Sequence, residues 1–146
     1  MDVHGTYAFD APAQRVWDLL MDPHAIADCL PGCESLDPAG ADRYRARLRV
    51  AVAAITGQYE GTVTIADKQP PVSYRLIVEG SGRAGFVNGD VTMRLREEGT
   101  RTTVDVSGSA QVGGTIAQVG QRLLGGVSRM LMDRFFGCLR GKAEGR

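Results

Sequence analysis

The segment Gly80-Ser-Gly82-Arg-Ala-Gly85 has the spacing of a glycine fingerprint for dinucleotide binding. That fingerprint binds a pyrophosphate only where it opens a helix whose amide groups face the phosphates. Here residues 86–95 alternate between apolar and polar side chains, which is typical of a strand. We therefore interpret the glycines as a turn between antiparallel strands, and we predict no cofactor.

Other residue types that commonly carry chemistry are sparse. His4 and His24 are the only histidines, and neither belongs to a Cys/His cluster, so no metal site is predicted. There is no Gly-x-Ser-x-Gly nucleophile motif. Asp67, Glu79 and Asp90 would be general acids or bases if they lined a cleft, but carboxylates are usually solvated. We predict no catalytic residue and expect the protein not to be an enzyme.

The three cysteines, Cys29, Cys33 and Cys138, are an odd number without a metal or redox spacing. They are typical of a cytosolic protein with reduced thiols. The N-terminus has no basic region followed by an apolar run, so no signal peptide is predicted. No stretch approaches the roughly 20 apolar residues that span a bilayer. We therefore expect a cytoplasmic location.

The length of 146 residues suits one domain, which we place at residues 1–146. Hydrophobic residues make up 43% and charged residues 23%, a balance that excludes disorder. Basic and acidic residues both number 17, so the formal net charge is zero. This balance gives no global attraction to nucleic acid, and no nucleic-acid partner is predicted.

The order of elements predicts the fold class. Val3–Phe9 alternates as a strand, and two short helices follow, separated at Asp22-Pro23 and stopped by Pro31-Gly32. Alternation then predicts about six further strands, of which the run Arg43–Ile55 would extend roughly 40 Å and would have to curl. We expect an α+β domain with a curved antiparallel sheet of about six to seven strands around a long C-terminal helix.

The C-terminal helix is predicted from a capping box at Thr115 and Gln118. Apolar residues then recur at three- and four-residue steps over residues 116–139, enough for about seven turns. Three glycines, Gly120, Gly125 and Gly126, lie inside this predicted helix and each costs roughly 0.8–1 kcal/mol. Either a space for a ligand or a tight contact between helix and sheet would explain them.

A curled sheet that closes over one helix leaves a space between them, and strand and helix parity predict which side chains face it. The predicted lining residues on the sheet side are Leu30, Tyr59, Tyr74, Leu76, Met93 and Val106. Those predicted on the helix side are Ile116, Gly120, Leu123, Leu124 and Val127. Such pockets are mostly apolar, so the predicted ligand is a hydrophobic small molecule.

A basic stripe lies on the opposite face of the first long strand. It consists of Arg43, Arg45, Arg47 and Arg49, which alternate with the inward residues. Cross-strand pairing with acidic residues would explain these arginines without a ligand. The alternative is a docking surface for a partner protein.

Several segments together carry a family resemblance. They are Ala11-Pro-x-x-x-Val16-Trp17-x-Leu19, Leu30-Pro-Gly-Cys33-Glu34-Ser-Leu36, Gly80-x-Gly82-x-x-Gly85-Phe86-Val-x-Gly89 and Val112-Gly-Gly-x-Ile116-Ala-x-x-Gly120. The chain resembles the CoxG family of carbon monoxide dehydrogenase subunits, within the helix-grip superfamily of START-like and Bet v 1-like (SRPBCC) domains. The resemblance covers essentially the whole chain.

The resemblance implies an accessory role for a molybdenum hydroxylase of the carbon monoxide dehydrogenase type, including help in placing that enzyme at the inner face of the cytoplasmic membrane. A lipid or an isoprenoid quinone would suit the expected cavity. Many members carry a hydrophobic tail after this domain, and none follows Leu139 here, so at most peripheral membrane contact is expected. Two alternatives stay open: a docking adaptor without a ligand, and a START-like cyclase or hydrolase.

Overall fold

A computed structural model of the chain describes residues 1–52 and 55–145. Its strands are β1 (Asp2–Phe9), β2 (Cys33–Pro38), β3 (Arg43–Val50), β4 (Gly57–Gln69), β5 (Ser73–Gly82), β6 (Gly85–Glu98) and β7 (Arg101–Gly113). Its helices are α1 (Ala13–Met21), α2 (Pro23–Cys29), the 3₁₀ helix η2 (Thr115–Val119) and α3 (Gln121–Ala143). These elements confirm the predicted α+β class.

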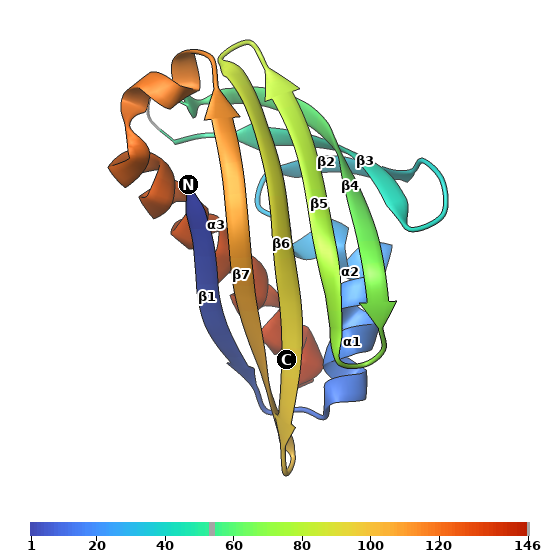
Figure 1. Cartoon of the computed structure of the whole chain (residues 1–146). Helices are drawn as coiled ribbons and strands as arrows, with labels where there is room; N and C mark the ends of the chain where they lie inside the picture. The colour runs from blue at the N-terminus through green and yellow to red at the C-terminus, as the bar shows by residue number, and fades with distance from the viewer. Residues whose placement is uncertain (53–54, 146) are drawn as a thin grey trace.

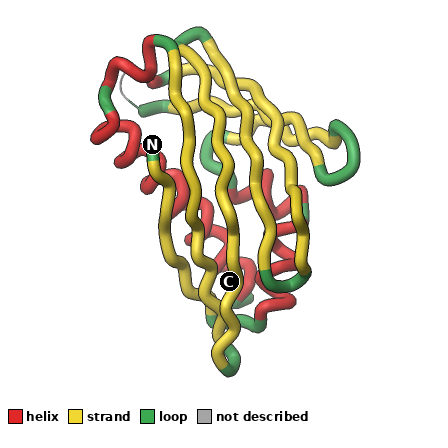
Figure 2. The backbone as a smooth tube through the Cα atoms, viewed as in Figure 1, coloured by secondary structure: helices red, strands yellow, loops and turns green. Residues whose placement is uncertain are grey.

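The strands form one antiparallel sheet of seven, in the order β1-β7-β6-β5-β4-β3-β2. The sheet curves, and the helices lie on one of its faces (Figures 1 and 2). Because β1 and β2 occupy the two edges, the segment that carries α1 and α2 connects one edge to the other. The long α3 packs against β1, α1 and α2.

Two glycines on the inner face allow the sheet to curl tightly. A Cβ atom at Gly61 would collide with the carbonyl oxygen of Glu79 on β5, and one at Gly108 would collide with the carbonyl oxygen of Asp90 on β6. Neighbouring strands therefore approach more closely there than any residue with a side chain would permit. This close approach lets one sheet wrap around a central space.

Two strand predictions need correction. β2 was not predicted, because Pro31-Gly32 and Pro38 around it resemble turn signals. The predicted run Arg43–Ile55 ends as a strand at Val50, which pairs with the first residue of β4, so the chain reverses direction soon after it. Residues 53 and 54 of that run lie outside the described part of the chain.

The predicted turn after Gly82 is confirmed, since Gly82 pairs with Gly85.

The C-terminal helix begins later than predicted. Gly120 has a φ of +93°, which ends η2 and separates it from α3. The predicted capping box is absent, because the Thr115 hydroxyl instead donates to the carbonyl oxygen of Ala84 at 2.8 Å. Gly125 and Gly126 do lie within α3, but a Cβ atom at either would meet nothing within 4 Å beyond its chain neighbours and the adjacent backbone of the same helix. A tight contact with the sheet therefore does not explain these two glycines.

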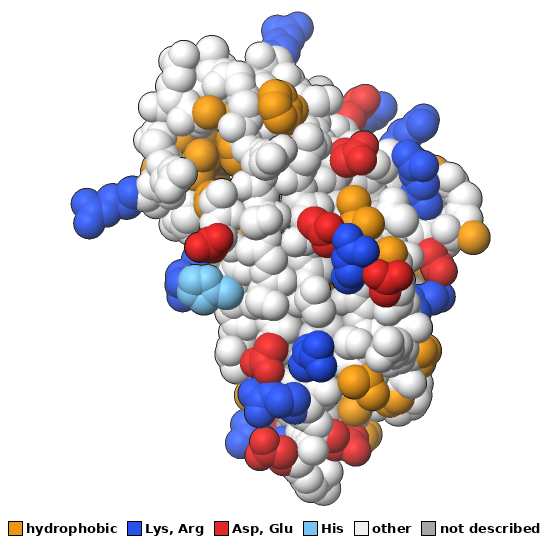
Figure 3. All heavy atoms as spheres, viewed as in Figure 1, with side chains coloured by type: hydrophobic (Ala, Val, Ile, Leu, Met, Phe, Trp, Pro, Cys, Tyr) orange, Lys and Arg blue, Asp and Glu red, His pale blue; other side chains and the backbone are white. Residues whose placement is uncertain are grey.

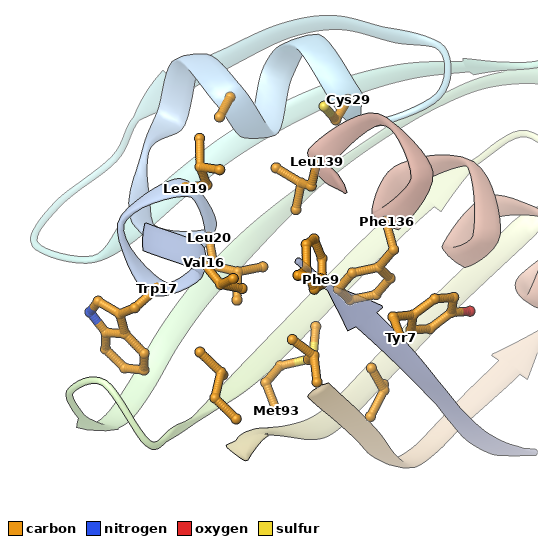
Figure 4. Close-up of a cluster of buried hydrophobic side chains, with 14 of the residues drawn as sticks. Tyr7, Phe9, Val16, Trp17, Leu19, Leu20, Cys29, Met93, Phe136 and Leu139 are labelled. Atoms are coloured by element: carbon orange, nitrogen blue, oxygen red, sulfur yellow. The ribbon is translucent and has the colours of Figure 1, made fainter. Parts of the chain in front are cut away.

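The main hydrophobic core lies where α1 and the C-terminal half of α3 meet β1, β6 and β7. Phe9 and Phe136 are each only 1% exposed, and Tyr7 stacks on Phe136 with ring centroids 4.2 Å apart (Figure 4). A second cluster, built on Ile55, Ile116 and Val127, lies at the end of the molecule that carries η2. The space between these two clusters is where the candidate site is found.

The prediction of reduced thiols is wrong for two of the three cysteines. Cys29 in α2 and Cys138 in α3 form a disulfide across a sequence separation of 109, and Cys33 is free. Sequence spacing could not indicate this pair, because it depends on the docking of α2 against α3. The cysteines therefore no longer support the expected cytoplasmic location.

Candidate ligand-binding site

A cavity of about 290 Å³ lies between the inner face of the sheet, α2 and the C-terminal half of α3. All six residues predicted on its sheet side line it: Leu30, Tyr59, Tyr74, Leu76, Met93 and Val106. Leu30 caps the C-terminal end of α2, and the others alternate inward along β4, β5, β6 and β7. Strand parity was sufficient to find these residues because each strand has one inward face.

More sheet residues line the cavity than were predicted. These additional residues include Leu36, Tyr44, Ala46, Leu48, Val63, Val78 and Val91. The signal for all of them except Leu36 was present in the sequence, because alternation places on an inward face Tyr44, Ala46, Leu48, Val63, Val78 and Val91. Leu36 was missed because β2 was not predicted.

The predicted helix side of the cavity is wrong. The α3 residues that line it are Leu131, Met132, Phe135 and Phe136. The predicted Ile116, Leu124 and Val127 instead pack in the second hydrophobic cluster at the η2 end of the molecule, where Leu123 and Val127 border a separate, more open hollow. Gly120 forms the break before α3, and Leu123 is 38% exposed. The break at Gly120 directs the first turns of α3 toward that end, so the cavity meets the helix about two turns later.

The cavity wall is almost wholly apolar, with tyrosines as its main polar groups. The Tyr59 hydroxyl donates to the carbonyl oxygen of Ile55 at 2.7 Å. The Tyr74 hydroxyl has no hydrogen-bond partner among the described residues, although Tyr74 is only 3% exposed. Burial raises the pKa of both tyrosines above the ordinary value, so both remain neutral near pH 7.

Charged side chains contribute little to this wall. No lysine, arginine or histidine is among the described residues that line the cavity. Glu60 and Glu79 border it, but their side chains are exposed, and Glu60 pairs with Arg47 at 3.2 Å. The wall therefore suits a neutral, largely apolar ligand, because a buried charge without a partner would be costly.

The carboxylates considered as acids or bases do not form an acid–base site. Asp67 and Asp90 both bind Arg75 in an exposed ion-pair cluster. Glu79 is exposed and binds no other described side chain. Within residues 1–52 and 55–145, no three His, Cys, Asp or Glu side chains are grouped to hold a metal ion.

The basic stripe is only partly neutralised by cross-strand pairs. Arg47 pairs with Glu60 at 3.2 Å and Arg49 pairs with Glu34 at 3.5 Å. Cross-strand pairing with acidic residues therefore accounts for these two arginines. Arg43 and Arg45 are exposed and form no ion pair with any described residue. Two guanidinium groups of the predicted docking surface are therefore available to a partner.

The η2 end of the molecule exposes apolar side chains. Phe86 at the start of β6 is 45% exposed and Leu123 in α3 is 38% exposed. Figure 3 shows hydrophobic side chains at this end, with basic side chains projecting beyond them. Exposed basic residues here include Arg83 and Arg122, neither of which forms an ion pair with a described residue. No helix in the described part of the chain is long and apolar enough to span a membrane.

A curved antiparallel sheet around a C-terminal helix, with an apolar cavity between them, defines a START-like helix-grip domain. A START superfamily protein from Mycobacterium smegmatis has this fold at a TM-score of 0.78, with 12% identity over 99% of this chain and 97% of that one. An aromatase/cyclase from Streptomyces sp. R1128 has a TM-score of 0.70, with 18% identity over 99% and 93%. At these identities, the likeness establishes the fold alone.

The chain belongs to the CoxG family of carbon monoxide dehydrogenase subunits, whose sequence pattern it matches over residues 5–144. This match confirms the resemblance inferred from the sequence segments. A conserved protein from Geobacillus kaustophilus is 35% identical, with a TM-score of 0.97 over 99% of this chain and 96% of that one. No significant match to a curated protein sequence was found.

Proposed function

We propose that this protein is a non-enzymatic carrier that holds a lipid or quinone in its cavity and serves a molybdenum hydroxylase of the carbon monoxide dehydrogenase type. The observation that carries the proposal is the apolar cavity of about 290 Å³ within a folded core. Interiors are normally packed to the density of organic crystals. A space of this size lined by aliphatic and aromatic side chains therefore favours an apolar occupant.

The geometry favours a carrier over an enzyme. The carboxylates of the wall, Glu60 and Glu79, keep their side chains exposed, and burial raises the pKa of Tyr59 and Tyr74 so that both hold their protons near pH 7. The described wall therefore offers a bound ligand no carboxylate or imidazole that would act as a general base. The family is described as one of carbon monoxide dehydrogenase subunits, which agrees with this accessory role.

The η2 end is the surface that we assign to membrane contact, at the inner face of the cytoplasmic membrane. Phe86 and Leu123 would enter the interface, while Arg83 and Arg122 would meet anionic headgroups. At roughly 1 kcal/mol per basic residue, this attraction supports weak and reversible binding. Reversible contact suits a protein that loads a ligand from one membrane and delivers it elsewhere.

Docking to the enzyme partner is assigned to Arg43 and Arg45. Their guanidinium groups have no ionic partner within the described chain, so an acidic surface on the hydroxylase would provide one. Such charge complementarity raises the association rate and selects the partner. The neighbouring Arg47 and Arg49 already bind Glu60 and Glu34 and would contribute less.

Filling the cavity tests the proposal. Val78 lines the cavity and pairs with Val63 on the inner face of the sheet. A Val78→Trp variant should remain folded and lose binding of the neutral apolar probe N-phenyl-1-naphthylamine. Val72→Trp is the matched control, because Val72 is 47% exposed and lies outside the cavity wall. Equal probe binding by both variants would contradict a ligand-carrying cavity.

Vesicle sedimentation tests the membrane contact separately. Binding to vesicles that contain anionic phosphatidylglycerol should exceed binding to neutral phosphatidylcholine vesicles. The Leu123→Asp variant should weaken vesicle binding and leave probe binding in the cavity intact. Unchanged sedimentation of this variant would refute the assignment of the η2 end.

A further inference from the structure

The Tyr74 hydroxyl is a polar group left without a partner inside an otherwise apolar wall. Tyr74 lies on the inner face of β5, and its ring packs perpendicular to the Trp17 ring with centroids 5.4 Å apart. It is 3% exposed, and its hydroxyl binds no described residue. A buried hydroxyl without a hydrogen bond normally destabilises a protein, so such groups are rare unless something else binds them.

We assign the open space beside this hydroxyl to the cavity, because Tyr74 lines the cavity and is otherwise buried. Every described side-chain nitrogen or oxygen that is sealed from open space has a hydrogen-bond partner. The Tyr74 hydroxyl has none, so it must border open space, and Tyr74 is one of the residues that line the cavity. Two half-buried tyrosines also line the cavity, Tyr44 and Tyr59, and the Tyr59 hydroxyl is already bound to Ile55. Tyr74 is the one of the three that is fully buried.

We infer that Tyr74 binds the polar head of the cavity's ligand by donating a hydrogen bond to a neutral acceptor oxygen, such as a ketone or quinone carbonyl. This inference rests on the proposed carrier function and specifies the chemistry of its ligand. The apolar body of the ligand then packs against Leu76, Met93 and Val106, which line the same cavity.

The absence of cationic side chains from the described cavity wall excludes an anionic head. A carboxylate or phosphate placed beside Tyr74 would lose its hydration without gaining a positive partner, at a cost that one hydroxyl cannot offset. A neutral carbonyl needs only one donor and loses far less hydration. Tyr74 supplies that donor and, because burial disfavours its ionised form, keeps its proton.

The inference predicts selectivity between two ligands of nearly equal shape. 2-Acetonaphthone carries a carbonyl group where 2-ethylnaphthalene carries a methylene, so the pair differs mainly in hydrogen-bonding capacity. Their affinities are measured by displacement of N-phenyl-1-naphthylamine from the wild-type protein and from two variants. Tyr74→Phe removes the unpartnered hydroxyl, and Tyr59→Phe is the matched control that removes a hydroxyl already bound to the backbone.

The expected result is a ratio of ketone to hydrocarbon affinity that falls about 3- to 10-fold in Tyr74→Phe, as for the loss of one hydrogen bond. The same ratio should be unchanged in Tyr59→Phe. An unchanged ratio in Tyr74→Phe, with both compounds still binding, would overturn the role of Tyr74 and leave the carrier function standing. If neither compound displaces the probe from the wild-type protein, the proposed function and this inference both fail.

A second measurement does not depend on folding of the variant. The carbonyl stretch of 2-acetonaphthone bound to wild-type protein should lie at lower frequency than that of the compound in hexane, because a donated hydrogen bond weakens the C=O bond. A stretch at the hexane frequency would overturn the inference. 2-Naphthoate, the anionic analogue, should fail to displace the probe, and tight binding of it would overturn the neutral-head assignment.

Discussion

Replacing Cys29 and Cys138 together by serine removes the covalent link between α2 and α3. The disulfide closes a loop with a sequence separation of 109. In the chain-entropy treatment, a cross-link over this separation stabilises the folded state by about 4.8 kcal/mol at 25 °C. Native disulfides usually contribute about 2–5 kcal/mol, so the double variant should lose an amount within that range.

Urea denaturation measures this loss without a change of redox state during the transition. For a domain of this size the urea m-value is about 2 kcal/mol per molar, so the midpoint should fall by about 1–2.5 M. Cys33→Ser is the matched control, because Cys33 is free, and it should shift the free energy of unfolding by less than about 0.5 kcal/mol. Thiol titration of the unfolded, unreduced wild-type protein should find one thiol per chain. Three thiols, together with equal stabilities of the variants and the wild-type protein, would refute the disulfide.

Three further predictions concern a glycine, a tyrosine and the arginine stripe. Gly125→Ala should raise the free energy of unfolding by about 0.8–1 kcal/mol in urea titrations, because the new methyl group meets open space and alanine favours helix. A loss of stability in this variant would show that the position needs glycine. Folding raises the pKa of Tyr7 to about 12 through burial and its hydrogen bond to Asp133. The stabilisation that Tyr7 gives the folded state is therefore complete below pH 10 and is lost as the pH rises through 12. Urea midpoints between pH 9 and 12 should fall less steeply in Tyr7→Phe, and parallel curves would contradict the assignment. Arg43→Glu with Arg45→Glu should abolish co-purification with the hydroxylase while the urea midpoint stays within error; retained co-purification would exclude this docking face.

The sheet side of the site could be predicted from the sequence because strand parity is a local property. Tyr59, Tyr74 and Met93 each fall on the inward face of a clearly alternating segment, and no knowledge of the tertiary structure was needed. The family resemblance likewise depended on short segments that can be read directly. Gly61 and Gly108 show the limit of such reasoning, since their role depends on how closely two strands approach.

The helix side could not be predicted because one backbone angle decides it. Apolar periodicity continues through Gly120 as if the helix were unbroken, yet the positive φ at this residue separates η2 from α3. The change in direction moves Ile116 into the η2-end cluster and brings Phe135 to the cavity. The disulfide between Cys29 and Cys138 could not be predicted either, because it forms only where α2 and α3 pack against each other.

The proposed functions of the surface residues depend on what the chain itself leaves unpartnered. Cross-strand pairing accounts for Arg47 and Arg49, but it leaves Arg43 and Arg45 free among the described residues. The same reasoning applies within the cavity, where Tyr59 is satisfied by the backbone and Tyr74 is not. A group that lacks a partner in the folded chain is the physical reason to expect a partner from outside.

Mass spectrometry of the organic extract from protein purified out of a native-like host tests the carrier function most directly. The wild-type chain and the Val72→Trp control should each release close to one equivalent of a single neutral, carbonyl-bearing apolar compound, and Val78→Trp should release little of it. A wild-type extract indistinguishable from that of Val78→Trp would contradict the claim that the cavity carries a ligand.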